Sequence, residues 1–447
     1  MRKAALHNLG CKVNAYETEA MQQLLEAAGY EIVDFEDVAD VYIVNTCSVT
    51  NVADKKSRQM LHRAKGRNPE AVVVAAGCYV QAAGDGLLKD SAVDLVIGNN
   101  KKTELVQILD EFFDTKTPAD GSVIDIGQTH EYEELHIEKL ADHTRAFIKV
   151  QDGCNQFCSY CIIPYTRGRV RSRRPEDVEE EVRKLSERGY QEIVLTGIHL
   201  SSYGVDFEKD GERTDLLGLI KRLHAIPGIR RIRFGSLEPR VVTEEFAREL
   251  SSLPKVCPHF HLSLQSGCDS VLKRMNRHYS CEEYRTGCDL LRKYFKDPAI
   301  TTDVIVGFPG ETDEEFLTTR DFLEQVHFYE MHVFKYSRRA GTRADRMPDQ
   351  VPEPVKTKRS GELLALEKKM SKEFRELFLG RETEVLLEEP VKIGDQWYML
   401  GHTREYVKAA VPMKEGEKPR KNVFVCGILK EFMTDDIIYL AENEILG

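Results

Sequence analysis

The chain has 447 residues, of which 41% are hydrophobic and 31% are charged, with a net charge of −11 and a mean hydropathy of −0.41. This length suits about three domains, and no run of 18 apolar residues exists that could cross a membrane. The first residues reach Gly10 and Cys11 too early for the apolar core of a secretory signal. Eleven cysteines without an export signal favour reduced thiols or metal ligands over disulfides, so we expect a cytoplasmic protein.

Residues 1–113 alternate between β-branched and amphipathic patterns, which indicates a doubly wound parallel α/β domain. Expected strands cover 3–10, 41–47, 71–78 and 94–99, and expected helices cover 16–29 and 52–66.

The next stretch, 114–143, is polar and carries a net charge of −6, which is more than half of the deficit of the whole chain. We expect it to be an acidic linker. Because the negative charge is concentrated there, the net charge of the chain does not exclude a nucleic-acid partner.

The same alternation resumes over residues 144–372. Six strands are expected at 146–151, 192–197, 231–236, 259–265, 301–308 and 331–336. Six βα units are too few for a closed eight-fold barrel, so the pattern predicts a partial (βα)6 barrel.

Residues 373–447 change to short strands separated by polar turns. These strands are expected at 383–389, 397–403, 406–412, 422–429 and 437–442. Five short strands in so short a segment predict a small β-barrel.

Cys154, Cys158 and Cys161 form a C-x3-C-x2-C triplet directly after the first strand of the predicted central barrel. Three thiolates on one loop can hold three irons of a [4Fe–4S] cluster and leave the fourth iron free for another ligand. A zinc site with a distant fourth ligand and ordinary structural thiols are the alternatives.

Cys11, Cys47 and Cys78 are far apart in the sequence, but each follows a predicted strand of the first domain. The carboxyl ends of neighbouring parallel strands meet at one edge of a sheet. The three thiols are therefore expected to converge on a second site of the same kind, with buried packing cysteines as the alternative.

The C-x3-C-x2-C triplet, with the aromatic Tyr160 before its last cysteine, resembles the radical S-adenosylmethionine (SAM) superfamily. That resemblance implies a [4Fe–4S] cluster with SAM on its open iron, and Tyr160 near the adenine. It also implies SAM contacts at the ends of barrel strands, where such folds build their sites. The candidates for these contacts are Gly197, Ser236, Glu238, Gln265 and Gly307.

Two cysteine triplets in this order, followed by a small β-barrel, resemble the methylthiotransferase family, as do LTGIHLSSYG, HLSLQSG, DVIVGFPGET and FKYSRRAGT. The resemblance implies two [4Fe–4S] clusters, SAM, and a C-terminal RNA-binding TRAM barrel. LGCKVNAYETE and NTCSVTNVADKKSR resemble the branch that modifies N6-threonylcarbamoyladenosine at position 37 of tRNA. The isopentenyladenosine branch typically has Gln-Met in place of Lys12 and Val13.

The family implies the tRNA anticodon loop and an electron-donor protein as partners. Arginine suits bidentate phosphate contacts, and five arginines directly after the cysteine loop are the candidates for them. They are Arg167, Arg169, Arg171, Arg173 and Arg174. Further candidates in the last barrel are Tyr398, His402, Arg404 and Tyr406. We expect a monomer, because no long exposed apolar stripe is evident.

Two other functions remain open at this stage. The same enzyme class could act on isopentenyladenosine or on a ribosomal-protein side chain. Alternatively, the chain could be a non-catalytic RNA-binding protein in which the cysteines hold structural zinc.

Overall fold

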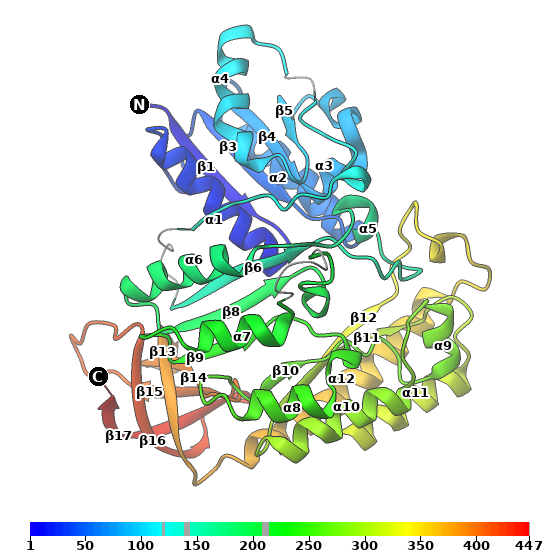
Figure 1. The fold of residues 1–447 in the computed structure, drawn as a ribbon, viewed down its shortest axis with the longest axis vertical. Coiled ribbons are helices and arrows are strands. Elements are labelled where there is room, and N and C mark those ends of the chain that lie inside the picture. The colour runs from blue at the N-terminus through cyan, green and yellow to red at the C-terminus, as the bar shows by residue number, and fades with distance from the viewer. Residues whose placement is uncertain (119–120, 138–143, 208–213, 447) are drawn as a thin grey trace.

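The computed structural model describes residues 1–118, 121–137, 144–207 and 214–446, which form three packed parts (Figure 1). The N-terminal part lies at the top of that view, the central part in the middle, and the C-terminal part at the lower left. Within the described residues, no helix is long and apolar enough to span a membrane.

The N-terminal part is a parallel five-stranded sheet with the strand order β2-β1-β3-β4-β5. Its strands are β1 (Lys3–Asn8), β2 (Glu31–Ile32), β3 (Val41–Thr46), β4 (Val72–Gly77) and β5 (Leu95–Ile97). The four strands predicted from the sequence are present, and the two-residue β2 was not predicted.

Helices cover both faces of this sheet, as predicted for a doubly wound domain. They are α1 (Lys12–Ala27), α2 (Asn51–Arg67), α3 (Cys78–Ala83) and α4 (Leu105–Thr115). Met21 of α1 and Ile108 of α4 pack in the core on one face, and Leu61 of α2 packs in the core on the other. Helix α1 begins four residues before the predicted start, because Cys11 occupies its N-cap position.

The central part contains the six predicted strands in a partial barrel. They are β6 (Arg145–Asp152), β8 (Glu192–Gly197), β9 (Arg231–Phe234), β10 (His259–His261), β11 (Ala299–Val306) and β12 (Glu330–Lys335). The sheets β6-β8-β9 and β10-β11-β12 are parallel, and the bridge from Leu237 to Leu262 connects them. A short antiparallel strand, β7 (Arg171–Ser172), pairs with β6 and was not predicted.

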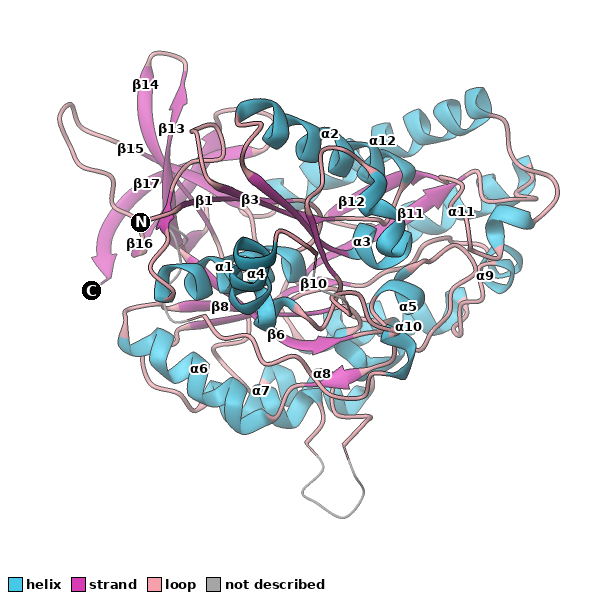
Figure 2. Ribbon diagram, turned by 90° about the horizontal axis from the view of Figure 1, so that it is seen from above, coloured by secondary structure: helices cyan, strands magenta, loops and turns pink. Residues whose placement is uncertain are grey.

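The helices of the central part cover the outside of these strands (Figure 2). They are α6 (Pro175–Glu187), α7 (Leu216–His224), α8 (Glu244–Ser251), α9 (Asp269–Arg274), α10 (Cys281–Tyr294), α11 (Asp313–Val326) and α12 (Glu353–Glu376). The short α5 (Ile163–Thr166) instead packs against α3 of the N-terminal part. Along β6, Ala146, Ile148 and Val150 belong to the core shared with these helices. Because side chains alternate along a strand, Arg145 and Phe147 lie on the inner face.

The C-terminal part is a closed five-stranded barrel, as predicted. Its strands are β13 (Glu382–Ile393), β14 (Gln396–His402), β15 (Lys408–Pro412), β16 (Val423–Phe432) and β17 (Ile437–Leu446). Its core extends to Phe374 and Phe378 at the end of α12, and to Ala299 and Tyr329 of the central part. The small barrel therefore packs directly on the central one.

The stretch expected to be an acidic linker is partly built into the fold. Leu135 and Ile137 are buried in the central core, and Tyr132 donates a hydrogen bond to the carbonyl of Lys149. Residues 138–143 of this stretch lie outside the described residues.

A cluster of buried charges joins the N-terminal and central parts. Glu17 of α1 accepts hydrogen bonds from Arg167 at 2.5 Å and Lys149 at 2.8 Å, and pairs with Lys102 at 3.2 Å. These four side chains are fully buried. Burial alone would raise the pKa of Glu17, but the three cations hold it well below its usual value. Glu17 is thus ionised at every pH near neutrality.

Replacing Glu17 by Ala should destabilise the folded protein by about 3–5 kcal/mol, because it leaves buried cations without their shared partner. Urea unfolding monitored by circular dichroism measures the change. The matched control is Glu31→Ala, since Glu31 pairs with Lys3 on the surface at 4.0 Å, where an ion pair contributes little. Equal effects of the two substitutions would contradict the assigned role of Glu17.

Candidate functional site

The loop after β6 carries the C-x3-C-x2-C triplet and is held in a fixed shape. Gly153 begins it with a φ of +70°, and a Cβ there would lie 1.8 Å from the carbonyl oxygen of Arg169. Asn276 donates hydrogen bonds to the carbonyls of Gln156 and Phe157 at 3.3 and 3.1 Å. The loop therefore needs glycine at its first residue and is fastened to the segment after α9.

All three thiols of this loop line one pocket of about 150 Å³ at the carboxyl ends of the barrel strands. Burial raises the pKa of Cys154 to about 11 and that of Cys161 to about 12. Arg277 donates a hydrogen bond to the Sγ of Cys158 at 3.2 Å. Three thiols around one pocket, with a cation beside them, fit a [4Fe–4S] cluster that keeps one iron open.

Four of the six residues expected to contact SAM line this pocket. They are Tyr160, Ser236, Glu238 and Gln265. Gly197 and Gly307 are not among the lining residues, because each packs against a side chain instead. A Cβ on Gly197 would lie 2.9 Å from Oε1 of Gln151, and one on Gly307 would lie 2.3 Å from Cγ of Lys356.

Seven lining residues of this pocket were not predicted to belong to a site, and Arg277 and His199 are the titratable ones among them. Arg277 stands in no motif, so only its position in the fold places it beside Cys158. His199 follows β8, and no sequence pattern distinguishes it from a core histidine. Burial lowers the pKa of His199 to about 4, so its ring is neutral near pH 7.

The second triplet lies at one edge of the N-terminal sheet. Cys11 follows β1, Cys47 follows β3 and Cys78 follows β4, and these three strands are neighbours. A Cβ on Gly10 would lie 2.9 Å from the Sγ of Cys47, so the loop that carries Cys11 packs directly on Cys47. Burial, together with the nearby Cys78 and Cys11, raises the pKa of Cys47 to about 11. The predicted convergence of the three cysteines is therefore present.

Arg167 connects the two cysteine regions. It follows Cys161 by six residues, yet its Nε donates a hydrogen bond to the Sγ of Cys78 at 3.3 Å. Its other nitrogens bind Asn14 at 2.6 Å and Glu17 at 2.5 Å, both in the N-terminal part. One side chain of the central part thus reaches the cysteines of the N-terminal part.

This geometry corrects the prediction that five arginines after the loop bind RNA. Arg167, Arg171 and Arg173 are fully buried. Arg171 donates to the carbonyl of Arg167 at 2.9 Å, and Arg173 pairs with a buried acidic side chain of α6. Only Arg169 and Arg174 of the five are exposed.

A second charged network joins the amino ends of the barrel strands to the C-terminal barrel. Glu192 pairs with Arg145 at 2.9 Å and with Arg233 at 2.8 Å, and Arg145 donates to the hydroxyl of Tyr406 at 2.6 Å. The Tyr406 ring stacks on His259, with ring centres 4.8 Å apart.

This network also corrects the prediction of RNA contacts in the last barrel. His402 is buried and stacks on Tyr406, with ring centres 4.3 Å apart. Arg404 donates to the carbonyl of Val256 in the central part at 2.7 Å. These side chains fasten the two barrels together, and Tyr398 is the remaining candidate.

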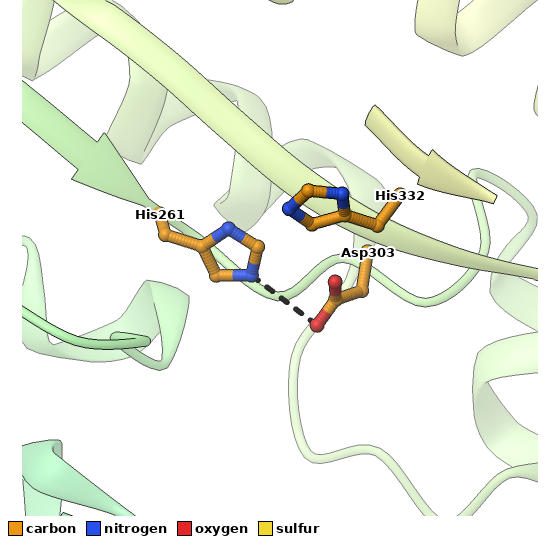
Figure 3. Close-up of side chains that lie close together, drawn as sticks. All are labelled: His261, Asp303 and His332. Carbon is orange, nitrogen blue, oxygen red and sulfur yellow. Dashed lines mark ion pairs between the residues drawn. The ribbon is translucent and has the colours of Figure 1, made fainter. Parts of the chain in front are cut away.

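His261, Asp303 and His332 lie on three neighbouring strands, on the side opposite the helices (Figure 3). Their ligand atoms lie within 4.8 Å of one another, which is a donor set able to hold a divalent metal ion. His261 already pairs with Asp303 at 3.2 Å and contacts the hydroxyl of Thr301 at 3.0 Å. The three groups thus form a polar patch on the inner face of the barrel.

Two family models match the chain. The model of the radical SAM superfamily matches residues 148–323, and that of "Uncharacterized protein family UPF0004" matches residues 3–98. These ranges carry the second and the first cysteine triplet, respectively.

Three curated relatives are similar over most of their length. The threonylcarbamoyladenosine tRNA methylthiotransferase MtaB of Bacillus subtilis is 44% identical and covers 91% of this chain and 90% of its own. The protein of that name from Aquifex aeolicus is 40% identical, covering 89% and 95%. The tRNA-2-methylthio-N6-dimethylallyladenosine synthase of Acetivibrio thermocellus is 39% identical, covering 89% and 83%.

Among solved structures, the radical SAM methyltransferase TsrM of Kitasatospora setae superposes with a TM-score of 0.59. The match covers 77% of each chain at 17% identity. This likeness concerns the fold alone.

The network around Glu192 predicts a pH dependence of stability. Burial alone would raise the pKa of Glu192, but Arg233, Arg145 and Arg231 lower it to about 2. A carboxyl with a depressed pKa stabilises the fold above its unfolded value, near 4.5, and that contribution disappears as pH falls from there toward 2.

The stability difference between wild type and Glu192→Gln should therefore shrink as the pH is lowered from about 6 to about 3. Urea midpoints at a series of pH values measure it, with exposed Glu382→Gln as the control. A difference that stays constant over this range would rule out the ionised state of Glu192 as its source.

Proposed function

This chain belongs to the radical SAM tRNA methylthiotransferase family, and we propose that its substrate is N6-threonylcarbamoyladenosine in tRNA, methylthiolated at C2 of the adenine. Among the relatives described, those at 44% and 40% identity carry the threonylcarbamoyladenosine name, against 39% for the dimethylallyladenosine enzyme. The observation that carries the proposal is the presence of two cysteine triplets joined through Arg167.

The first cluster and SAM would be held in the central pocket. Cys154, Cys158 and Cys161 are the proposed ligands, and the walls with Tyr160, Ser236, Glu238 and Gln265 would hold SAM. When bound, these groups supply a carbon radical, which can remove the unactivated hydrogen of C2 where acid–base chemistry cannot. The chain's own part is to bind and orient, with Arg277 holding Cys158 and Gly153 allowing the turn of the loop.

A second cluster is proposed at Cys11, Cys47 and Cys78, as the place from which the methylthio group is delivered. The convergence of the three thiols at one sheet edge supports it. Arg167 would then play a positioning role, because it donates to Cys78 while its backbone belongs to the loop of the other triplet.

We further propose the following domains and partners. We assign residues 1–113 to the methylthiotransferase domain, 114–143 to a linker, 144–372 to the radical SAM core, and 373–447 to a TRAM domain. The partners would be the anticodon loop of tRNA and an electron-donor protein, and the enzyme would act as a cytoplasmic monomer. Exposed Arg169 and Arg174 remain as phosphate contacts.

Isopentenyladenosine in tRNA is the second candidate substrate, favoured by the 39% identity to the dimethylallyladenosine enzyme. A panel of tRNAs bearing either nucleoside, followed by mass spectrometry of the digested nucleosides, decides between the two. Product on threonylcarbamoyladenosine alone is expected. Product on isopentenyladenosine alone would replace the proposal.

Replacing Cys11, Cys47 and Cys78 together by Ala should abolish methylthiolation but leave the reductive cleavage of SAM measurable, because the other triplet is unchanged. The assay follows 5′-deoxyadenosine and the modified nucleoside in the same anaerobic reaction. Cys257→Ala, at a buried cysteine of the central part, is the control. If the triple variant keeps its other cluster and yet cleaves no SAM, this division of labour is wrong.

Replacing Arg169 and Arg174 by Gln should weaken tRNA binding and lower the slope of log affinity against log salt by about 0.7–0.9 for each lost phosphate contact. Filter binding at several salt concentrations measures the slope. Arg183→Gln is the matched control, since it pairs with Glu179 on the surface of α6. An unchanged slope would remove these arginines from the interface.

A further inference from the structure

Lys12 stands between the N-terminal cysteine set and the inner face of the central barrel. It follows Cys11 directly and is the first residue of α1. Its Nζ lies 6.0 Å from the centre of the Phe147 ring, which is on the inner face of β6, the strand that leads into the Cys154 loop. A substrate that lies beside Cys11 and reaches toward the inner face of the barrel would therefore meet this ammonium group.

The charge of Lys12 has no acidic partner among the described residues. The charged side chains that act on it are the cations Arg145 and Arg233. The carboxylate of Glu192 is engaged by these same two arginines. An ammonium that lies near two cations and has no counter-ion is electrostatically unfavourable. Lys12 nevertheless keeps accessible surface, so a ligand can supply the missing negative charge.

His259 provides a second unpaired group in the same region. Its Nδ1 is buried and has no hydrogen-bond partner among the described residues. Burial lowers the pKa of His259 well below its usual value, and Arg233 and Lys12 lower it further, so the ring is neutral. Stacking on Tyr406 fixes the plane of the ring. A neutral imidazole held in this way can donate one hydrogen bond to an anion.

We propose that Lys12 and His259 form a subsite that binds the carboxylate of the threonylcarbamoyl group on the substrate. The inference rests on the proposed function, in which the adenine lies between the two cysteine sets. The threonylcarbamoyl group ends in a carboxylate that is ionised at neutral pH, whereas a dimethylallyl group carries no charge. The subsite favours the threonylcarbamoyl group, because its carboxylate pairs with Lys12. It disfavours the dimethylallyl group, which would leave the ammonium of Lys12 unpaired.

The test measures kcat/KM of the enzyme with both clusters loaded on two tRNAs. One bears N6-threonylcarbamoyladenosine, and the other bears the same nucleoside with its carboxyl group converted to a neutral amide. Wild type should prefer the native tRNA by about 10–100-fold, the usual contribution of a hydrogen bond to a charged group. Lys12→Gln should lose this preference, and Lys12→Arg should keep most of it.

Two controls separate the subsite from damage elsewhere. Lys89→Gln removes an exposed charge of the N-terminal part and should behave as wild type. Iron content and 5′-deoxyadenosine formation without tRNA show whether Lys12→Gln retains its clusters.

The proposal is overturned if Lys12→Gln keeps the wild-type preference, or if it loses activity equally on both tRNAs. A wild-type enzyme that does not modify the native tRNA contradicts the proposed function itself, and the subsite is then wrong with it. Loss of the preference in Lys12→Gln, with activity on the amide unchanged, is the result that supports the subsite.

Discussion

The buried contacts of Arg167 are the constraint on which the arrangement of the site depends. The side chain leaves the loop of one cysteine triplet and reaches Asn14, Glu17 and the thiol of Cys78 in the other part of the chain. A guanidinium offers its donors in a fixed planar geometry, and a buried charge that loses a partner is costly. The two parts can therefore rotate little against each other without breaking this cluster.

The opposite end of the central barrel is closed by a comparable network. Arg145 and Arg233 share Glu192, and Tyr406 of the small barrel stacks on His259 beneath the inner face. The inner face is thus bordered by all three parts of the chain. The central part contributes the Cys154 loop, and the N-terminal part contributes Cys11 and Lys12. The C-terminal part contributes the ring of Tyr406, which stacks on His259.

The sequence was sufficient for the longer strands of all three parts, because apolar periodicity marks each of them. It also predicted the convergence of Cys11, Cys47 and Cys78, since the carboxyl ends of neighbouring parallel strands must meet. The short strands β2 and β7 were missed, because two residues are too few to show a period.

The roles of the charged residues could not be predicted in the same way. A run of arginines indicates a phosphate-binding surface when their acidic partners are not known. The sequence does not reveal such a partner for Arg167, because Glu17 lies 150 residues away from it. The same holds for Arg277, which reaches Cys158 across 119 residues. Gly197 and Gly307 stand where strand ends meet the site, but side chains from elsewhere, Gln151 and Lys356, fill the space beside them.

Arg167 thus holds the two cysteine sets, and with them the two clusters proposed there, at one fixed separation. Pulsed dipolar EPR of the reduced enzyme with both clusters loaded measures this separation most directly. We expect a single narrow distance distribution in the wild type and a broadened one in Arg167→Met. Identical distributions in the two proteins, or no interaction between the clusters in the wild type, would contradict it.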